Sequence, residues 1–428
     1  MAKDFIDSKI QKFSNLVGLD LPYFIKGGFW LIFSITTAAL GGLFLSSLFA
    51  RVWPKDVFGQ YSFLMAALGF LGLTTLPGMG QAIVQAVSEG KEGTYWFATK
   101  LLFKWSLLGT IFLLLGSAYF YIRENQNLAL AVLFAALVFP LNGSLGLFSS
   151  YLNGMKDFKK MAIYSTSTQL FSIGAVSIVL LNFSSLVLVA LTATWSAALA
   201  YSFFTYLTFR KIRNNLVDFK LIKLGKALSV TAVMTNGVDY FDRFAIPFFL
   251  GFSENAVYAI AIIIPMQMLN FLKVSTNLAQ PKLVEIKEEK ARKVLLFKSI
   301  QLEIPIVIMV LAYILAAPTI FKFLYPDYQP AVFLSQVFAI SILYYPSNLF
   351  GLYLIKKRAI GKALLSAVIY VVVSIISLLI FLSLWGLIGA VFSKIFVKIV
   401  QVVITQIFFN SELAKAKASN IQKSRFTD

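Results

Sequence analysis

The sequence predicts an all-α integral membrane protein with about 12 transmembrane helices. Of its 428 residues, 59% are hydrophobic and only 13% are charged, and the mean hydropathy is +0.80. A soluble domain of this size cannot bury so much apolar surface. Apolar runs long enough to cross a bilayer recur about twelve times, and the connections between them are short. We therefore expect a bundle of membrane helices without a large domain outside the membrane.

The positions of Lys and Arg predict the orientation of the helices. Of the 38 basic residues, four are expected within the membrane, and the short loops of one side hold only Arg51, Lys55, Arg123 and Lys322. The other 30 lie in the N-terminal segment, the alternate loops and the C-terminal tail. Because cytoplasmic loops concentrate Lys and Arg, we expect a multi-pass protein of the inner (cytoplasmic) membrane with both termini in the cytoplasm. The same rule explains the net charge of +19 without a nucleic-acid partner.

Three short matches between the halves of the chain predict an internal repeat. The matched segments lie about 200 residues apart and occur in the same order. They pair YLNGMKDFKKMAI (151–163) with YLIKKRAIGKALL (353–365), DVFGQYSF (56–63) with SENAVYAI (253–260), and SLVLVAL (185–191) with GLIGAVF (386–392). Because six spans per repeat is an even number, the sequence predicts two parallel six-helix lobes around a central cavity, which would hold the substrate near the bilayer midplane.

These observations define five expected segments. A short amphipathic segment is expected to lie on the cytoplasmic membrane surface before the first lobe, and a basic linker is expected to join the lobes. The boundaries are 1–26 for the amphipathic segment, 27–209 for the N-terminal lobe, 210–226 for the cytoplasmic linker, 227–409 for the C-terminal lobe and 410–428 for the cytoplasmic tail.

The composition argues against an enzyme. The chain has no Cys and no His, so thiol chemistry and the commonest general base and metal ligand are excluded. No P-loop motif is present, so ATP is not expected to be the direct energy source. We expect no catalytic residue, no metal site and no cofactor, apart from a possible coupling ion. A membrane polysaccharide polymerase or glycosyltransferase remains a less favoured alternative, because such enzymes need catalytic groups on water-exposed loops.

The segment NGVDYFDR (236–243) places charges deep in the seventh expected span. Counted from Lys226 at about 1.5 Å per residue, Asp239 lies roughly 20 Å and Arg243 roughly 25 Å into the helix. Asn236, Asp239 and Arg243 share one helical face, with Asp242 three residues after Asp239. A charge at this depth costs at least about 2.5 kcal/mol, so this face must meet a partner helix or water. The alternative is that Asp239 or Asp242 pairs with Arg243 only to hold the helix.

The twelfth expected span carries a matching polar stripe. Lys394, Lys398, Gln401 and Thr405 recur at helical spacing, and Lys273 lies deep in span eight. Surplus cations in a hydrated cavity suit an anionic headgroup such as a pyrophosphate, although the lysines could also snorkel or serve only the structure. Asp239 and Asp242 are candidate ion-coupling residues for H⁺ or Na⁺. The candidate substrate-binding residues are Arg243, Lys273, Lys394, Lys398, Asn236, Gln81, Gln85 and Gln401.

Three motifs stand out in the chain: RVWPKDVFGQYSF (51–63), LPGMGQAIVQ (76–85) and VDYFDRFAIPFFLGFSENAVYAIA (238–261). Together they resemble the polysaccharide transporter family, the O-antigen and capsule-type flippases of the multidrug/oligosaccharidyl-lipid/polysaccharide exporter superfamily. Two positions depart from the family pattern. Gln85 stands where an arginine is common, which leaves more of the cationic role to Arg243 and the span-twelve lysines, and Ala256 stands where glycine is usual.

The resemblance implies a flippase for a polyprenyl-pyrophosphate-linked oligosaccharide, such as an O-antigen, capsule or exopolysaccharide repeat unit. Such a flippase moves its cargo from the cytoplasmic to the outer leaflet by alternating access, and the resemblance implies membrane lipids and other polysaccharide assembly proteins as its partners. A multidrug exporter of the same fold is the main alternative. It would bind organic cations, and the four intramembrane cations of this chain argue against it.

Overall fold

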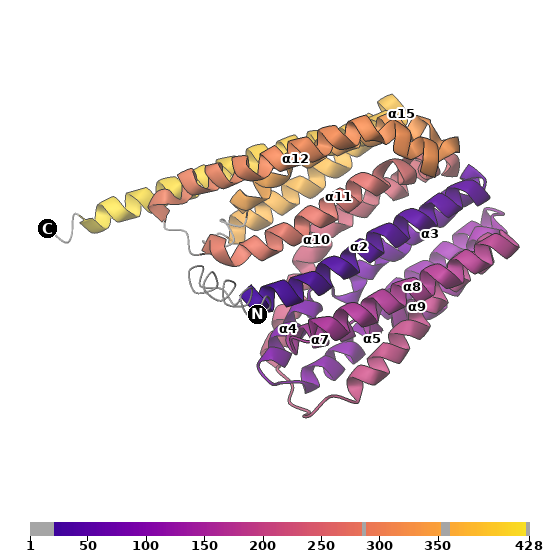
Figure 1. Ribbon diagram of the computed structural model, residues 1–428, viewed down its shortest axis with the longest axis horizontal. Helices are drawn as coiled ribbons and strands as arrows, with labels where there is room; N and C mark the ends of the chain where they lie inside the picture. The colour runs from indigo at the N-terminus through magenta and orange to yellow at the C-terminus, as the bar shows by residue number, and fades with distance from the viewer. Residues whose placement is uncertain (1–20, 285–287, 352–359, 425–428) are drawn as a thin grey trace, which may run out of the picture. The chain divides into compact units, whose positions relative to one another are not determined.

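The computed structural model describes residues 21–284, 288–351 and 360–424, and the side chains of some residues within these ranges, Asn236 and Asp239 among them, lie outside the description. Within the described ranges every regular element is a helix, which confirms the predicted all-α class (Figure 1). The helices are α2 (Leu21–Val52), α3 (Lys55–Leu71), η1 (Gly72–Thr75), α4 (Met79–Ser88), α5 (Gly93–Ile122), α6 (Gln126–Leu145), α7 (Phe148–Gly154), α8 (Phe158–Phe183), α9 (Leu186–Phe209), α10 (Phe219–Leu250), α11 (Phe252–Val284), α12 (Glu288–Leu324), η2 (Pro326–Tyr328), α13 (Pro330–Ile340), η3 (Ser341–Ser347) and α15 (Ile360–Ser424).

The helices agree with the predicted number of spans. Ten helical segments in the described ranges are long and apolar enough to cross a membrane, so the chain is a multi-pass membrane protein. The last of them, Leu365–Ala414, is 50 residues long and is divided at Gly386, whose φ of 59° and ψ of −139° break the helix. Helix α10 has 32 residues, which is long enough to cross a membrane, and it is not among the ten. With α15 divided and α10 added, the segments of spanning length reach twelve.

The chain forms two compact units, and one segment of the N-terminal half belongs to the second unit. Unit 1 comprises Met1–Leu48 and Leu71–Val230, and unit 2 comprises Phe49–Phe70 and Thr231–Asp428. Helix α10 therefore begins in unit 1 and ends in unit 2. The predicted amphipathic segment 1–26 lies largely outside the described residues. The predicted lobe boundaries stay predictions, and so does the central cavity.

Unit 1 is built around helices α5, α6, α8 and α9. Helix α5 packs on α6, α6 packs on α9, and α9 packs on α8. The expected second span is interrupted: Leu76 adopts a left-handed φ of 54°, Pro77 follows, and α4 begins at Met79. A Cβ on Gly78 would lie 2.5 Å from the backbone nitrogen of Ser229, whose hydroxyl accepts a hydrogen bond from Gly78 N at 3.0 Å. Because Gly78 has no Cβ, the backbone between Leu76 and Met79 can pack directly against the first part of α10.

In unit 2, a glycine of α3 likewise allows close backbone packing, here against the start of α11. A Cβ on Gly59 of α3 would lie 1.8 Å from the carbonyl oxygen of Phe252, so only glycine fits there. Asn255 Nδ2 donates to the carbonyl oxygen of Gly59 at 2.9 Å. The ring of Phe63 contacts those of Phe244 and Phe252, at centroid distances of 5.4 and 5.8 Å. The start of α3 is therefore fixed against the end of α10 and the start of α11.

Candidate functional site

Asp242 is the centre of a buried polar cluster in unit 2. Its side chain is 1% exposed, and it lies in the part of α10 where the sequence analysis placed deep charges. Lys394 Nζ lies 2.9 Å from Asp242 Oδ2, and the Tyr258 hydroxyl donates to the same oxygen at 2.5 Å. The backbone N–H of Arg243 donates to Oδ1 at 2.8 Å. Three helices, α10, α11 and α15, thus supply one carboxylate with its partners.

The ion-pair partner of Asp242 among the described residues lies on another helix. Lys394 of α15 forms this pair, and the alternative in which Asp239 or Asp242 pairs with Arg243 only to hold the helix stays a prediction. Lys394 is itself mostly buried, with 19% of its side chain exposed. A carboxylate and an ammonium withdrawn from water must satisfy each other closely, because the desolvation penalty is several kcal/mol per ion. The pair therefore joins α10 to the second stretch of α15.

Arg243 follows Asp242 and is half-buried. Its Nε is buried and has no hydrogen-bond partner among the described residues. Among the described residues its guanidinium forms no ion pair, while the neighbouring Asp242 carboxylate contacts Lys394 and Tyr258. A buried guanidinium donor without a protein acceptor is suited to an anionic ligand.

The polar stripe of the twelfth expected span continues beyond Lys394. Lys398 Nζ lies 3.1 Å from Gln401 Oε1 and 5.3 Å from the centre of the Tyr370 ring. All three residues belong to α15, with Tyr370 before the break at Gly386. The sequence-predicted residues Lys394, Lys398 and Gln401 therefore share one helical face, and the first of them reaches Asp242.

The remaining candidates are more scattered. Lys273 is exposed on α11. Gln81 and Gln85 are exposed on α4 of unit 1, and Gln85 Nε2 donates to Glu89 at 2.9 Å. The side chains of Asn236 and Asp239 lie outside the described residues. The substrate-binding and ion-coupling roles assigned to these positions stay predictions.

Sequence reasoning missed Tyr258 as a member of the cluster. Its side chain is completely buried, and its hydroxyl donates to the Asp242 carboxylate. A signal was present, because the internal repeat aligns Tyr258 with Tyr61 at the same place in the two matched segments. Tyr61 packs instead in an aromatic cluster, with its ring 4.6 Å from that of Phe49. The repeat thus preserves the tyrosine, but only the second copy supplies a buried acid for it.

A second polar cluster, also missed, surrounds Glu92 in unit 1. Glu92 is 5% exposed, and its Oε2 accepts hydrogen bonds from the Tyr151 hydroxyl at 2.7 Å and from the backbone N–H of Arg213 at 3.0 Å. Lys91 Nζ lies 2.5 Å from Asp218 Oδ2. The hydrogen bond from Lys91 is the main cause that lowers the pKa of the Asp218 carboxyl. These contacts attach the segment between α9 and α10 to the turn before α5.

The described residues contain no group of three or more Asp or Glu side chains placed to hold a metal ion. The chemistry available in the Asp242 cluster is therefore charge compensation. It consists of one buried ion pair, one phenol donor and a guanidinium whose Nε has no described acceptor. Such an arrangement can exchange a protein partner for a ligand anion or a cation.

The fold is shared with solved transporters of low sequence identity. It is similar to "Lipid II flippase MurJ, inward closed conformation", with a TM-score of 0.70 and 14% identity over 90% of this chain and 87% of that one. It is also similar to an outward-facing multidrug resistance MATE family transporter of the MOP superfamily, with a TM-score of 0.66 and 12% identity over 92% and 96% of the two chains. A third similar structure, an inward-facing multidrug resistance MATE family transporter, has a TM-score of 0.63 and 13% sequence identity, and the match covers 89% of this chain and 96% of that one.

None of the curated proteins matches the sequence. The polysaccharide biosynthesis protein family, by contrast, matches residues 24–259, which is more than half of the 428 residues. The matched range contains the motifs of 51–63 and 76–85 completely and the motif of 238–261 up to residue 259. The match confirms the resemblance that these motifs indicated. The chain therefore belongs to the polysaccharide biosynthesis protein family.

Proposed function

We propose that this protein is a flippase that moves a polyprenyl-pyrophosphate-linked oligosaccharide from the cytoplasmic to the outer leaflet of the inner membrane. The observation that carries this proposal is the buried Nε of Arg243, which lacks an acceptor among the described residues beside the Asp242–Lys394 pair. A pyrophosphate offers several anionic oxygens to such a donor. Family membership and the transporter fold support a saccharide cargo and a transport role.

In this mechanism the protein uses charge compensation and performs no covalent chemistry. Arg243, together with Lys398 and Lys394, would bind the pyrophosphate in a hydrated cavity, and the saccharide would follow the headgroup. The prenyl tail would stay in lipid while the lobes rock between inward-open and outward-open states. Both termini would lie in the cytoplasm, and other polysaccharide assembly proteins would supply and use the cargo.

Asp242 gives the cycle a place where an ion could act. The carboxylate binds Lys394 in this structure. If H⁺ or Na⁺ neutralised Asp242, Lys394 would be released and could bind the pyrophosphate instead. We propose this exchange as the coupling step. It predicts that Asp242→Asn uncouples transport from the ion gradient, whereas unchanged gradient dependence in that variant would exclude Asp242 as the coupling residue.

The test uses a deletion strain of the native host. Its lipids are extracted, and polyprenyl-pyrophosphate-linked oligosaccharides are quantified by mass spectrometry. We expect a completed repeat unit to accumulate, and wild-type protein and an Arg123→Ala control to reverse the accumulation. Arg123 is an exposed arginine after α5, outside the site. Arg243→Ala should fail to reverse it, and Arg243→Lys should reverse it only partly, because lysine keeps the charge but loses the forked geometry.

Other outcomes would point to other functions. If no lipid-linked saccharide accumulates and the strain becomes sensitive to cationic dyes, the protein is a multidrug exporter. If a truncated repeat unit accumulates, the protein acts in synthesis and is an enzyme. Expression of each variant at the wild-type level in the membrane fraction must be shown before the comparison is made.

A further inference from the structure

Unit 2 contains a cavity with two charged side chains in a largely apolar lining, at the end of the membrane helices and separate from the Asp242 cluster. Its volume is about 540 Å³, and it is lined by the ends or beginnings of α3, α10, α11 and α13 and by the break in α15. Lys55 and Glu254 both line it, together with Ser253, Phe333 and Trp385. The cavity therefore offers one ammonium and one carboxylate at the membrane surface, beside two large aromatic side chains.

The two charges lack protein partners of opposite sign. In the part of the chain that the structure describes, neither Lys55 nor Glu254 forms an ion pair. Lys55 Nζ lies 5.3 Å from the centre of the Tyr328 ring, and the neighbouring Asp56 accepts a hydrogen bond from Gln60. A ligand with one positive and one negative group would match this pair of charges, whereas a purely anionic ligand would be repelled by Glu254.

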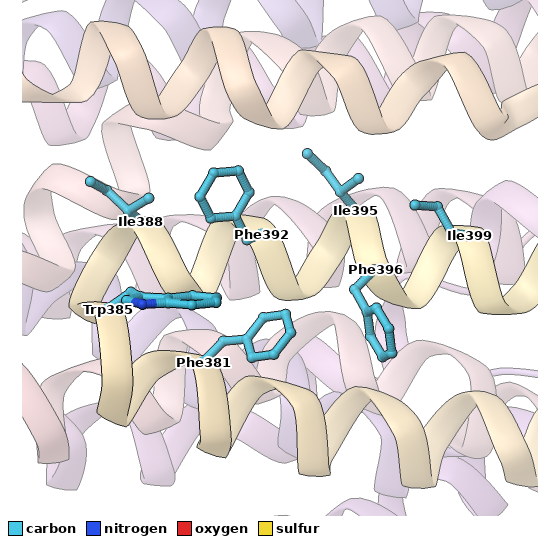
Figure 2. Close-up of a pocket in the computed structure, with 7 residues that line it drawn as sticks. All are labelled: Phe381, Trp385, Ile388, Phe392, Ile395, Phe396 and Ile399. Carbon is cyan, nitrogen blue, oxygen red and sulfur yellow. The ribbon is translucent and has the colours of Figure 1, made fainter.

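An apolar groove continues from this cavity. It has a volume of about 630 Å³ and is lined only by Phe, Trp and Ile side chains of α15. Trp385 and Ile388 line both the groove and the cavity, so the two are contiguous. Figure 2 shows Trp385 near the turn, with Phe381 and Phe396 between the two stretches of α15; the centroids of these two rings are 5.7 Å apart.

The length of the groove selects its occupant. From Ile388 to Ile399 the helix rises about 16 Å at about 1.5 Å per residue. This is about half of the roughly 30 Å hydrocarbon core, which is the depth of one leaflet. An acyl chain of an ordinary phospholipid fits this depth, whereas a polyprenyl chain is longer than one leaflet. The lysine stripe faces away from the groove, since Lys394 contacts Asp242 while Phe392 and Phe396 line the groove.

We infer that the cavity and groove together form a binding site for one zwitterionic phospholipid with an ethanolamine-type headgroup. The ammonium of the headgroup pairs with Glu254, its phosphate pairs with Lys55, and one acyl chain lies along Phe392 and Phe396. Trp385 sits at the boundary between headgroup and chain, where indole rings are favoured. In the predicted orientation this end of the helices lies in the outer leaflet. The inference concerns a bilayer lipid, and it does not depend on the proposed flippase activity.

The test places the full chain in nanodiscs with a trace of photoreactive lipid. Phosphatidylethanolamine and phosphatidylglycerol with the same diazirine-bearing acyl chain are compared, and the labelled peptides are mapped by mass spectrometry. We expect the ethanolamine lipid to label residues 381–399 about three- to fivefold more than the glycerol lipid, the size of a partly exposed ion-pair effect. Glu254→Gln should abolish this preference. Glu124→Gln, which changes an exposed glutamate in the loop between α5 and α6, should keep it.

A second variant separates headgroup recognition from the groove. Trp385→Ala should lower labelling of 381–399 by both lipids, because it opens the boundary between cavity and groove. Three results would overturn the inference: equal labelling by the two lipids in the wild type, labelling spread evenly over exposed faces of α5 and α8, or displacement of the ethanolamine lipid by equimolar polyprenyl phosphate. None of these readouts requires transport, so they are independent of the flippase test.

Discussion

Among the described residues, each unit buries one carboxylate almost completely, and the two carboxylates have different partners. In unit 1, Glu92 lies in a turn and accepts hydrogen bonds from the Tyr151 phenol and from the backbone of Arg213. In unit 2, Asp242 lies within a helix and contacts Lys394 and Tyr258, which come from two other helices. A turn leaves backbone N–H groups available, whereas a helix uses nearly all of its own. Asp242 accepts one hydrogen bond from the backbone N–H of Arg243, and its other partners, Lys394 and Tyr258, are side chains from neighbouring helices.

The two carboxylates hold different parts of the protein together. The contacts of Glu92 attach a connecting segment and need not change during activity. The ion pair of Asp242 joins α10 to α15, and a change in its protonation or in its partner would alter how these helices are held together. We expect substitutions in the Asp242 cluster to have the larger effects and those around Glu92 and Asp218 to have progressively smaller ones.

The largest effect is expected when one partner of the buried pair is removed. Lys394→Met should lower the free energy of unfolding by about 3–5 kcal/mol, because it leaves the Asp242 carboxylate buried without a counter-ion. The double variant Asp242→Asn with Lys394→Met should recover most of this loss. Unfolding of purified protein in one detergent, followed by circular dichroism, measures the coupling between the two sites.

Lys398→Met provides the control for that double-mutant cycle, because Lys398 lies one turn away and contacts Gln401. It should change stability much less. If the effects of Asp242→Asn and Lys394→Met simply add, the pair contributes no coupling energy, and the contrast between the two units would fail.

The next effect tests how the helices of unit 2 are brought close enough to form the cluster. Gly59→Ala should destabilise the protein by about 1–3 kcal/mol or more, because the new Cβ would overlap the carbonyl of Phe252. Gly72→Ala is the matched control, since a Cβ there has no atom within 4 Å. Thermal unfolding of both variants should show a clear decrease in midpoint only for Gly59→Ala. Equal midpoints would mean that α3 can shift away from α11 at little cost.

A smaller effect is expected at Glu92. Glu92→Ala should leave the Tyr151 hydroxyl and the Arg213 backbone N–H without their acceptor, at a cost of about 1–3 kcal/mol. Because these bonds hold the segment between α9 and α10, trypsin should cleave after Arg210, Lys211 or Arg213 about tenfold faster than in the wild type. Glu89→Ala, which changes an exposed glutamate in the same turn, should leave the cleavage rate nearly unchanged. An equal acceleration in both variants would mean that the buried contacts do not hold the segment.

The smallest effect is a pH dependence at Asp218. The pKa of its carboxyl is lowered in the folded protein, chiefly by the hydrogen bond from Lys91. Its stabilising contribution is therefore complete above the pKa of the unfolded state and is lost as pH falls through the lower folded-state pKa. Hydrogen exchange of the first amides of α10, corrected for intrinsic rates, should increase between about pH 5 and pH 2. Asp218→Asn should remove this dependence.

The sequence was sufficient to predict the class of fold and the number of spans. Apolar runs of bilayer length determine these features locally, because each membrane helix must satisfy its own backbone hydrogen bonds. The same reasoning predicted charges deep in the seventh and twelfth spans, because Asp242 and Lys394 stand where charge is expensive. The motifs of 51–63, 76–85 and 238–261 also predicted the polysaccharide family, which the family match confirms.

Tertiary structure decided which of these charges meet. The helical period places Asp242 and Arg243 next to each other, yet it cannot show that Lys394 is the partner of Asp242 or that Tyr258 completes the cluster. It also could not reveal that the segment after α9 is held by Glu92, or that Lys55 and Glu254 border one cavity. Local sequence determines which side chains a helix presents, whereas the partners of the buried charges come from other elements, in the case of Lys394 more than a hundred positions away, and only packing brings them within hydrogen-bond distance.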